Sequence, residues 1–539
     1  MVTLAFGALD LAVVGVYFAV LAATGAWFAK RGAKDTDDYF LGGRQMPMWA
    51  VAVSVLATSL SAATFIGGPQ QAYVGDLTYL STNIGMVIAA VVIAVWFIPA
   101  FYRERVGTVY ELLDRRAGAG GQRAASAMFM LGRVFASGAR LFIVALPATL
   151  IVFGEPAGGE VPASQLVLAI GAMTIVGILY TLVGGISSVI WSDVIQTGVF
   201  LAAVIGAITL LLMRIPVGPA EIAQVLSGSP GATPGSSKLT VISLSTDPGA
   251  AYTLWSVVIG FTLLGIASYG TDQDLVQRML TCKNAKAGSW SVISAQLMGI
   301  PVVLLFMAVG LLLYVFYARP DVMGASMPSD SPDDSRTVFL SFILREMPAG
   351  MSGLMMAGLF AAGLSSLNSA INAMSSTLVS DFYRPMRAGM PERHYVLVGR
   401  AAVVGWGLVL GSFACFCVYW QRASGQTLID FALSVMTFAY AGLLGVFFCV
   451  LFTKRGSTLS VIGALVVGFV VILVQQPMVW GWGAFVALDA RVGVDLSLAA
   501  SLAFPWKLSI GAALAFGVAL LGSPRAGAQA ERAAPTAAR

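Results

Sequence analysis

The chain has 539 residues, of which 58% are hydrophobic and only 11% are charged, and its formal net charge is +5. Soluble domains carry about one quarter charged residues, so this composition excludes a water-soluble protein and predicts a multi-pass protein of the lipid bilayer. The small positive charge does not indicate nucleic-acid binding, because in a membrane protein the position of basic residues matters more than their sum.

Apolar runs long enough to cross a hydrocarbon core of roughly 30 Å recur from end to end. They predict an all-α fold with about thirteen transmembrane helices. The first run lacks a basic leading segment and is too long for a signal peptide, so we expect a retained helix. The expected spans are 9–29, 47–74, 80–102, 124–154, 164–187, 190–213, 250–271, 288–317, 348–382, 396–420, 427–453, 457–482 and 505–523.

Basic residues gather in alternate loops, as they do on the cytoplasmic side of membrane proteins. One predicted cytoplasmic loop carries Arg278, Lys283 and Lys286, and the tail carries further arginines. This asymmetry predicts an N-terminus outside and a C-terminus in the cytoplasm, in the plasma membrane or, for a bacterium, the inner membrane.

Two spans contain segments that should not stay helical. Small and polar residues at 57–63 precede Gly67, Gly68 and Pro69 in the second span, and GIASYG at 265–270 weakens the seventh. Unwound turns expose backbone carbonyls, which transporters tolerate where the turns line a cavity near the bilayer midplane. Weak helices five spans apart are what an inverted repeat of five helices would give.

Ionisable residues at membrane depth are costly and normally face a pathway or a partner. Asp193 lies at the start of the sixth span, and Asp272 and Asp274 lie at the end of the seventh. Arg133 and Arg140 are seven residues apart, on one face of the fourth span. The pattern also allows the two neighbouring aspartates to be interfacial residues at a helix end, and it allows Arg133 to reach the cytoplasmic surface by snorkelling.

The stretch FAAGLSSLNSAINAMSS makes the ninth span unusually polar. Small hard cations prefer oxygen ligands, and Ala362 and Ser365 face the same side of a helix with Ser366 adjacent. If the second span unwinds against them, the carbonyls of Ala57 and Leu60 would complete a site of five oxygens. Serine and alanine also mediate close helix packing in membranes, and spacing alone leaves both interpretations open.

Several motifs, in order along the chain, resemble the sodium:solute symporter family, which includes sodium-coupled sugar, proline, pantothenate, monocarboxylate and sialic acid transporters. They are DYFLGGR at 38–44, the segment 57–64, GGISSVIWSDVIQ at 184–196, TDQDLVQR at 271–278 and AAGLSSLNSAINAMSSTLVSDFYR at 361–384. The resemblance implies a leucine-transporter-type core of two inverted five-helix repeats, with alternating access driven by sodium.

Under this resemblance the chain divides into six parts. They are a leading helix and first cytoplasmic loop at 1–46, a first five-helix repeat at 47–213, an extracellular loop at 214–249, a second repeat at 250–453, two trailing helices at 454–524 and a disordered cytoplasmic tail at 525–539.

The resemblance also implies sodium ligands. The family's common sodium site falls on the carbonyls of Ala57, Leu60 and Ala362 and the hydroxyls of Ser365 and Ser366. A second site found in some members would use Asp193 and Ser369, but Asn368 stands where a serine or threonine is expected. This departure leaves the number of sodium ions open, and in the alternative interpretation Asp193 only hydrogen-bonds to the eighth core helix.

By the same analogy the solute lies at the midplane, between the broken helices. The expected contacts are Ser61, Thr64, Asn83, Arg140, Ser268 and Asp272. Asn83 occupies the position at which sugar carriers have an acidic residue, which argues against a sugar. A buried Arg140 would pair with a carboxylate through its two-pronged guanidinium. The expected function is therefore import of a small organic anion or zwitterion together with sodium.

Other classes are less well supported. A transporter-like sensor would need a cytoplasmic output domain, for which the tail after Leu521 is too short. A membrane-embedded enzyme is not favoured, because the single histidine, His394, and four unclustered cysteines offer no triad or zinc site. A symporter of the same fold that uses protons, with Asp193 titrating, stays open. Nothing in the sequence indicates an obligate protein partner.

Overall fold

The structure is a computed structural model that describes residues 7–31, 36–60, 62–154, 161–233, 235–328, 332, 335–424, 427–476 and 501–523. Within these ranges the secondary structure is helical, and β-pairing is limited to isolated bridges. The first part of the chain forms α1 (Ala8–Arg31), α2 (Thr36–Leu41), η1 (Gly42–Arg44), α3 (Met48–Ser59), α4 (Ala62–Val74), η2 (Thr78–Ser81), α5 (Thr82–Val92), η3 (Ile93–Phe97), α6 (Ile98–Glu104), α7 (Glu111–Phe153), α8 (Ala163–Arg214) and α9 (Pro219–Gly228).

The second part begins with a span that is repeatedly interrupted. Its helices are α10 (Leu254–Ser256), η4 (Val257–Phe261), α11 (Thr262–Ile266), η5 (Ala267–Thr271), α12 (Gln273–Leu280), α13 (Ala285–Ala318), α14 (Pro320–Met323), η6 (Gly324–Ser326), α15 (Val338–Arg345), α16 (Met351–Thr377), η7 (Leu378–Tyr383), α17 (Arg384–Met386), α18 (Glu392–Ser424), α19 (Leu428–Phe452), α20 (Thr458–Val474) and α23 (Phe504–Leu520).

The helices have the length and composition of membrane spans. In the described ranges nine helical stretches can cross a bilayer, and the bent pair α3 and α4 would make a tenth. Three shorter apolar helices, at Ala163–Leu179, Thr458–Val474 and Phe504–Leu520, coincide with further expected spans. The all-α membrane fold is confirmed, while the count of about thirteen spans, the orientation of the termini and the six-part division stay predictions.

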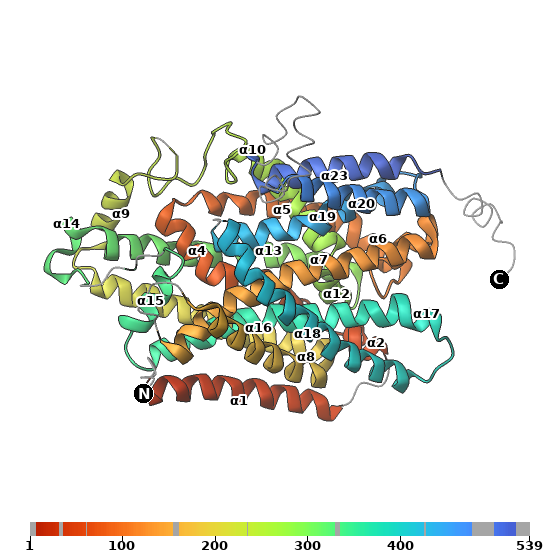
Figure 1. The fold of residues 1–539 in the computed structure, drawn as a ribbon, viewed down its shortest axis with the longest axis horizontal. Helices are drawn as coiled ribbons and strands as arrows, with labels where there is room; N and C mark the ends of the chain where they lie inside the picture. Colours follow the sequence, from red (N-terminus) through yellow and green to blue (C-terminus); the bar gives the residue numbers. More distant parts are fainter. Residues whose placement is uncertain are drawn as a thin grey trace.

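The leading and trailing helices lie on opposite sides of the bundle. In Figure 1, α1 runs along the lower edge, and α20 and α23 run along the upper edge. α1 packs on α8 and α16, whereas α20 and α23 pack on α19. The broken helices and α16 therefore lie between these outer layers.

Asp10 of α1 holds the start of α16. Its carboxylate accepts hydrogen bonds from the backbone amides of Gly350 and Gly353 at 2.7 and 2.9 Å and from the hydroxyl of Ser352 at 2.7 Å. The first amides of a helix lack partners within the helix, and an acceptor there stabilises its start. Here another helix supplies the acceptor, which fixes α16 against α1.

The polar helix α16 lies inside the protein, away from lipid. Its side chains are buried along nearly the whole helix, and it packs against α8, α7, α18 and α3. Some of its hydroxyls are satisfied locally, as where Ser375 donates to the carbonyl oxygen of Ile371 at 2.7 Å. Others face neighbouring helices and form the site described below.

Both expected helix interruptions are present. Helix α3 ends at Ser59, Leu60 is extended (φ −85°, ψ 92°), and α4 continues the span after a bend of 58°. In the seventh span the π-helix η5 is followed by extended backbone at Asp272 (φ −98°, ψ 116°) before α12 begins. This second break lies two residues beyond the segment 265–270 that the sequence marked as weak.

The backbones of α4 and α13 approach each other closely at Gly310, where the absence of a side chain permits the contact. A Cβ atom at this position would overlap the backbone carbonyl of Pro69, which cannot move aside as a flexible side chain can. We expect Gly310→Ala to lower the free energy of unfolding by about 1–3 kcal/mol, as other overpacked sites do, measured as thermal stability in detergent. Gly517→Ala in α23, where nothing lies within 4 Å of the new carbon, should leave stability unchanged. Equal losses in the two variants would contradict this account.

Candidate sodium and solute site

A small cavity lies where the break between α3 and α4 meets α16 and α8. Its lining residues are Ala57, Leu60, Gln196, Thr197, Phe200, Ala361, Ala362 and Ser365. Four of these belong to the predicted first sodium site. The fifth predicted ligand, Ser366, adjoins Ser365 in α16, and its hydroxyl donates to the carbonyl oxygen of Ala362 at 3.3 Å. The structure therefore brings the five predicted residues together, from two segments some 300 residues apart in sequence.

The donor atoms around the cavity suit a small monovalent cation. Because α3 ends at Ser59, the carbonyls of Ala57 and Leu60 lie at a helix C-terminus, which carries partial negative charge. Ser365 and Ser366 add hydroxyl oxygens. Neutral oxygens of this kind fit Na⁺, and the described residues contain no cluster of three His, Cys, Asp or Glu side chains that would hold a multivalent metal.

Asp193 of α8 contacts Ser365 but does not itself line the cavity. Its Oδ1 accepts a hydrogen bond from the Ser365 hydroxyl at 2.5 Å, and its Oδ2 accepts one from the Ser54 hydroxyl at 2.5 Å. The Arg278 guanidinium contacts the same Oδ2 at 3.2 Å. Asp193 thus hydrogen-bonds to the eighth core helix, as one interpretation of the sequence expected, and it is also ion-paired.

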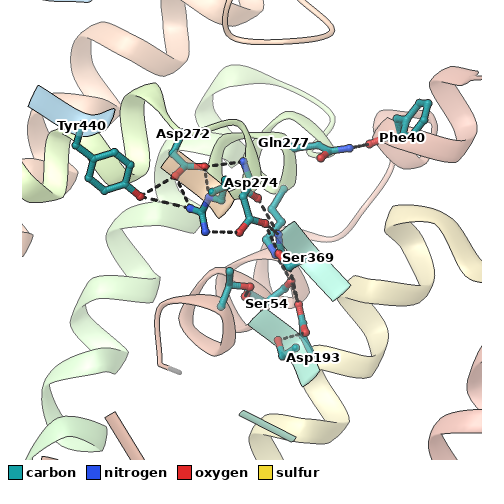
Figure 2. Close-up of polar contacts among 12 residues, drawn as sticks. Phe40, Ser54, Asp193, Asp272, Asp274, Gln277, Ser369 and Tyr440 are labelled. Carbon is teal, nitrogen blue, oxygen red and sulfur yellow. Dashed lines mark hydrogen bonds and ion pairs between the residues drawn. The ribbon is translucent and has the colours of Figure 1, made fainter. Parts of the chain in front are cut away.

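A buried ion network continues from Arg278 to Tyr440 of α19, and Figure 2 shows its carboxylates Asp193, Asp274 and Asp272 and the tyrosine. Asp274 bridges two guanidinium groups, because Arg278 Nη1 lies 3.0 Å from its Oδ1 and Arg133 Nη1 lies 2.9 Å from its Oδ2. Arg133 also donates two hydrogen bonds to the Asp272 carboxylate, one from Nε at 3.0 Å and one from Nη2. The Tyr440 hydroxyl donates to Asp272 Oδ2 at 2.6 Å. These groups are at most 2% exposed, apart from the tyrosine at 3%.

The network corrects three sequence-based interpretations. Arg133 does not reach the protein surface by snorkelling, and Asp272 and Asp274 are not solvent-exposed residues at a helix end, because all three are buried and paired. Arg278 was expected in a cytoplasmic loop and is instead 1% exposed. The reason is that α12 is a short helix packed into the bundle after the break. The spacing of Asp274 and Arg278, four residues apart, was the available signal.

The residues of the predicted second sodium site point to different partners. The Asn368 amide oxygen accepts a hydrogen bond from the Thr181 hydroxyl at 3.2 Å. The Ser369 hydroxyl donates to Asp274. Asp193 faces Ser365, Ser54 and Arg278 as described above. A second sodium site would need these three side chains to point to one place. Each of them is instead hydrogen-bonded to a different partner.

Two predicted solute contacts, Arg140 and Asp272, face the same stretch of α19. Arg140 Nη2 lies 3.5 Å from the sulfur of Met436, and Asp272 bonds to Tyr440 one turn further on. The Asp272 carboxylate is already occupied by Arg133. In the described residues the Arg140 guanidinium has no carboxylate at ion-pair distance, so it is the cationic group of this region that remains available to a ligand.

The other predicted solute contacts lie on several helices. Thr64 in α4 and Ser268 in η5 are buried. Asn83 in α5 is half-buried, and its amide nitrogen donates to the carbonyl of Leu80 at 2.9 Å. Ser61 lies outside the described residues.

An all-helical bundle with two interrupted membrane helices, one of which borders a small cavity beside a buried ion network, is typical of secondary transporters. The sequence model of the sodium:solute symporter family matches residues 39–470. The chain belongs to this family.

Relatives of known name align with most of this chain. It is 30% identical over 501 residues to the sodium/sialic acid symporter SiaT of Proteus mirabilis (strain HI4320), covering 91% of each chain. It is 26% identical to the human sodium/iodide cotransporter, covering 86% of this chain and 69% of that protein. A substrate-bound, outward-open structure of a sodium-coupled sialic acid symporter has a TM-score of 0.76 at 25% identity, covering 96% of this chain and 99% of that one.

These comparisons establish the general activity. The chain is a sodium-coupled solute symporter in a membrane, and sodium is its coupling ion. The structure of the nucleobase-cation symporter Mhp1, with a TM-score of 0.52 at 16% identity, supports the fold alone. Sodium coupling in the relatives favours the sodium interpretation over the proton-coupled alternative, and their role as transporters supports a protein that is not an enzyme.

Proposed function

We propose that this symporter imports a small organic carboxylate or zwitterion by alternating access, with Arg140 binding the carboxylate of the solute. The observation that carries this proposal is the pairing of the buried guanidinium groups. Arg133 and Arg278 are each held by two aspartates. Arg140, on the same face of α7 as Arg133, has the sulfur of Met436 as its hydrogen-bond partner and forms no ion pair among the described residues.

Arg140 is partly buried, and a cation that is shielded from water without an anion is costly, so protein sites normally neutralise it. A solute carboxylate would supply the missing charge and two acceptor oxygens, which match the geometry of a guanidinium. Relatives named sodium/sialic acid symporters and sodium-coupled monocarboxylate transporters support this class of solute. The neutral side chain of Asn83 in α5 agrees better with an acidic or zwitterionic solute than with a neutral sugar.

The proposed sodium site is the cavity that Ala57, Leu60, Ala362 and Ser365 help to line, with Ser366 adjoining it. Because two of its ligands belong to the break in the second span, a bound sodium ion would hold that break against α16. Thr64 lies on the other side of the same break, so the ion would also fix the segment proposed to contact the solute. This arrangement gives a physical route by which sodium favours solute binding.

Arg140→Ala and Arg140→Lys should reduce solute affinity on the order of a hundredfold, because one partner of a buried charge pair is lost or misplaced. The solute is first identified by thermal stabilisation of the purified protein with small carboxylates, amino acids and sugars, each in sodium and in choline. Uptake of that solute is then compared between the variants and the parent protein. Stabilisation by sodium alone should persist in both variants, because Arg140 does not line the sodium cavity. Unchanged uptake would rule out the carboxylate proposal.

A further inference from the structure

We propose that Tyr17 of the leading helix α1 is a positioning residue for the sodium site, because it holds the side chain of Gln196 with the amide oxygen presented to the cavity. The inference rests on the proposed sodium site and deepens it by adding a group in the cavity wall and the residue that orients this group. It gives α1, which precedes the region matched by the family model, a part in sodium binding.

The Gln196 amide has one satisfied and one unsatisfied end. The residue lies one turn beyond Asp193 in α8, is 2% exposed and lines the cavity. Its Nε2 donates a hydrogen bond to the Tyr17 hydroxyl at 3.3 Å. Among the residues that the structure describes, its Oε1 has no hydrogen-bond partner. A buried carbonyl oxygen without a partner is costly, and a cation in the cavity would offset that cost.

Polar contacts tie α1 to both of the long helices that line the cavity. Much of α1 is exposed, as at Val16, which is 63% exposed, whereas its neighbour Tyr17 is 5% exposed. Asp10 and Tyr17 are seven residues apart and therefore lie on one face of the helix. The Asp10 carboxylate binds the start of α16, and the Tyr17 hydroxyl binds α8 through Gln196.

An aromatic contact supports the same arrangement. The rings of Tyr17 and Phe18 pack edge to face with their centroids 5.1 Å apart, and the Phe18 ring lies 6.1 Å from the ring of Phe360 in α16. Phe360 directly precedes Ala361 and Ala362, which line the cavity. The two neighbouring aromatic residues of α1 therefore contact both α8 and α16 beside the proposed sodium site.

The orientation of the Gln196 amide matters because its two ends carry opposite partial charges. The oxygen end attracts a cation and the amino end repels it, so the amide dipole contributes to the potential in the cavity. The Tyr17 hydroxyl occupies the amino end and leaves the oxygen end for the cavity. Hydrogen bonds between membrane helices contribute little to stability on average, so the main effect of this contact should be on sodium affinity.

The test is the sodium concentration that gives half of the maximal thermal stabilisation of the purified full-length protein, with choline holding the ionic strength constant. Tyr17→Phe removes one hydroxyl and should raise this midpoint roughly three- to tenfold, the effect of losing one hydrogen-bonding interaction. Thr24→Val removes a hydroxyl of the same helix that bonds to the carbonyl of Val20, and it should leave the midpoint unchanged. An unchanged midpoint in Tyr17→Phe would overturn the proposal. A parent protein that sodium does not stabilise would instead contradict the proposed sodium site itself.

A double-mutant cycle shows whether Tyr17 acts through Gln196. Gln196→Met removes the amide and should also raise the midpoint, and Tyr17→Phe/Gln196→Met should bind sodium no more weakly than Gln196→Met alone. Additive losses would give Tyr17 a different route of action and overturn the proposal. So would a lower melting temperature of Tyr17→Phe in choline with an unchanged sodium midpoint, because the contact would then be merely structural. Tyr17→Phe decides the question by itself if Gln196→Met does not fold.

Discussion

Ser365→Ala should weaken sodium binding by roughly 10- to 100-fold, as expected when a hydrogen-bonding or ligand group to a charged partner is removed. The serine lines the cavity, and its hydroxyl also satisfies Asp193. The substitution therefore removes one proposed sodium ligand and one of the hydrogen bonds that solvate a buried carboxylate. The measurement is the sodium concentration that gives half of the maximal thermal stabilisation, with choline holding the ionic strength constant.

The same helix provides a matched control for this substitution. Ser375 is as deeply buried as Ser365, but its hydroxyl bonds only within α16, to the carbonyl of Ile371. Ser375→Ala should leave the sodium midpoint unchanged. A Ser365→Ala protein with an unaltered midpoint would remove that serine from the ligand set.

The spans and breaks could be predicted from the sequence because lipid imposes simple rules. A chain inside a bilayer must satisfy its backbone hydrogen bonds within helices, so apolar runs report spans directly. Departures from that rule are equally visible, and the small polar residues before Pro69 and the glycines of the seventh span marked both interruptions. The residues proposed for the first sodium site could be grouped for the same reason, since they belong to one such break and to the serine pair of α16.

The ion network could not be predicted in the same way. Arg278 was assigned to a loop because the distribution of basic residues reports which side of the membrane a loop faces, not whether a short helix such as α12 folds back into the bundle. The cavity walls from Gln196, Thr197 and Phe200 were also missed. These residues meet α16 only through tertiary packing of α8, for which the sequence carries no periodic signal.

The network joins the two proposed binding regions physically. Its members follow one another from the sodium cavity to α19 in the order Ser365, Asp193, Arg278, Asp274, Arg133, Asp272 and Tyr440. Contiguous charged contacts of this kind can carry coupling between sites if they have two discrete arrangements. The break at Asp272 is the element that would change, because it connects the network to the span that we propose contacts the solute.

Arg133→Met should be the most destabilising substitution in this network. It leaves Asp272 and Asp274 buried side by side without their shared guanidinium, and loss of one partner from a buried pair lowers the free energy of unfolding by about 3–5 kcal/mol. We expect a large fall in melting temperature and no transport. Arg214→Gln, which breaks the exposed pair with Glu346, should change stability by about 1 kcal/mol or less.

A double variant separates stability from function. Arg133→Gln/Asp272→Asn removes one charge of each sign and leaves Asp274 paired with Arg278, so thermal stability should recover largely. Transport should not recover, because Asp272 also caps α12 and bonds to Tyr440, and the neutral pair no longer fixes the break against α19. If Arg133→Met were as mild as Arg214→Gln, the position of α12 would depend on apolar packing, and the ion network would not be what aligns the solute region with the sodium cavity.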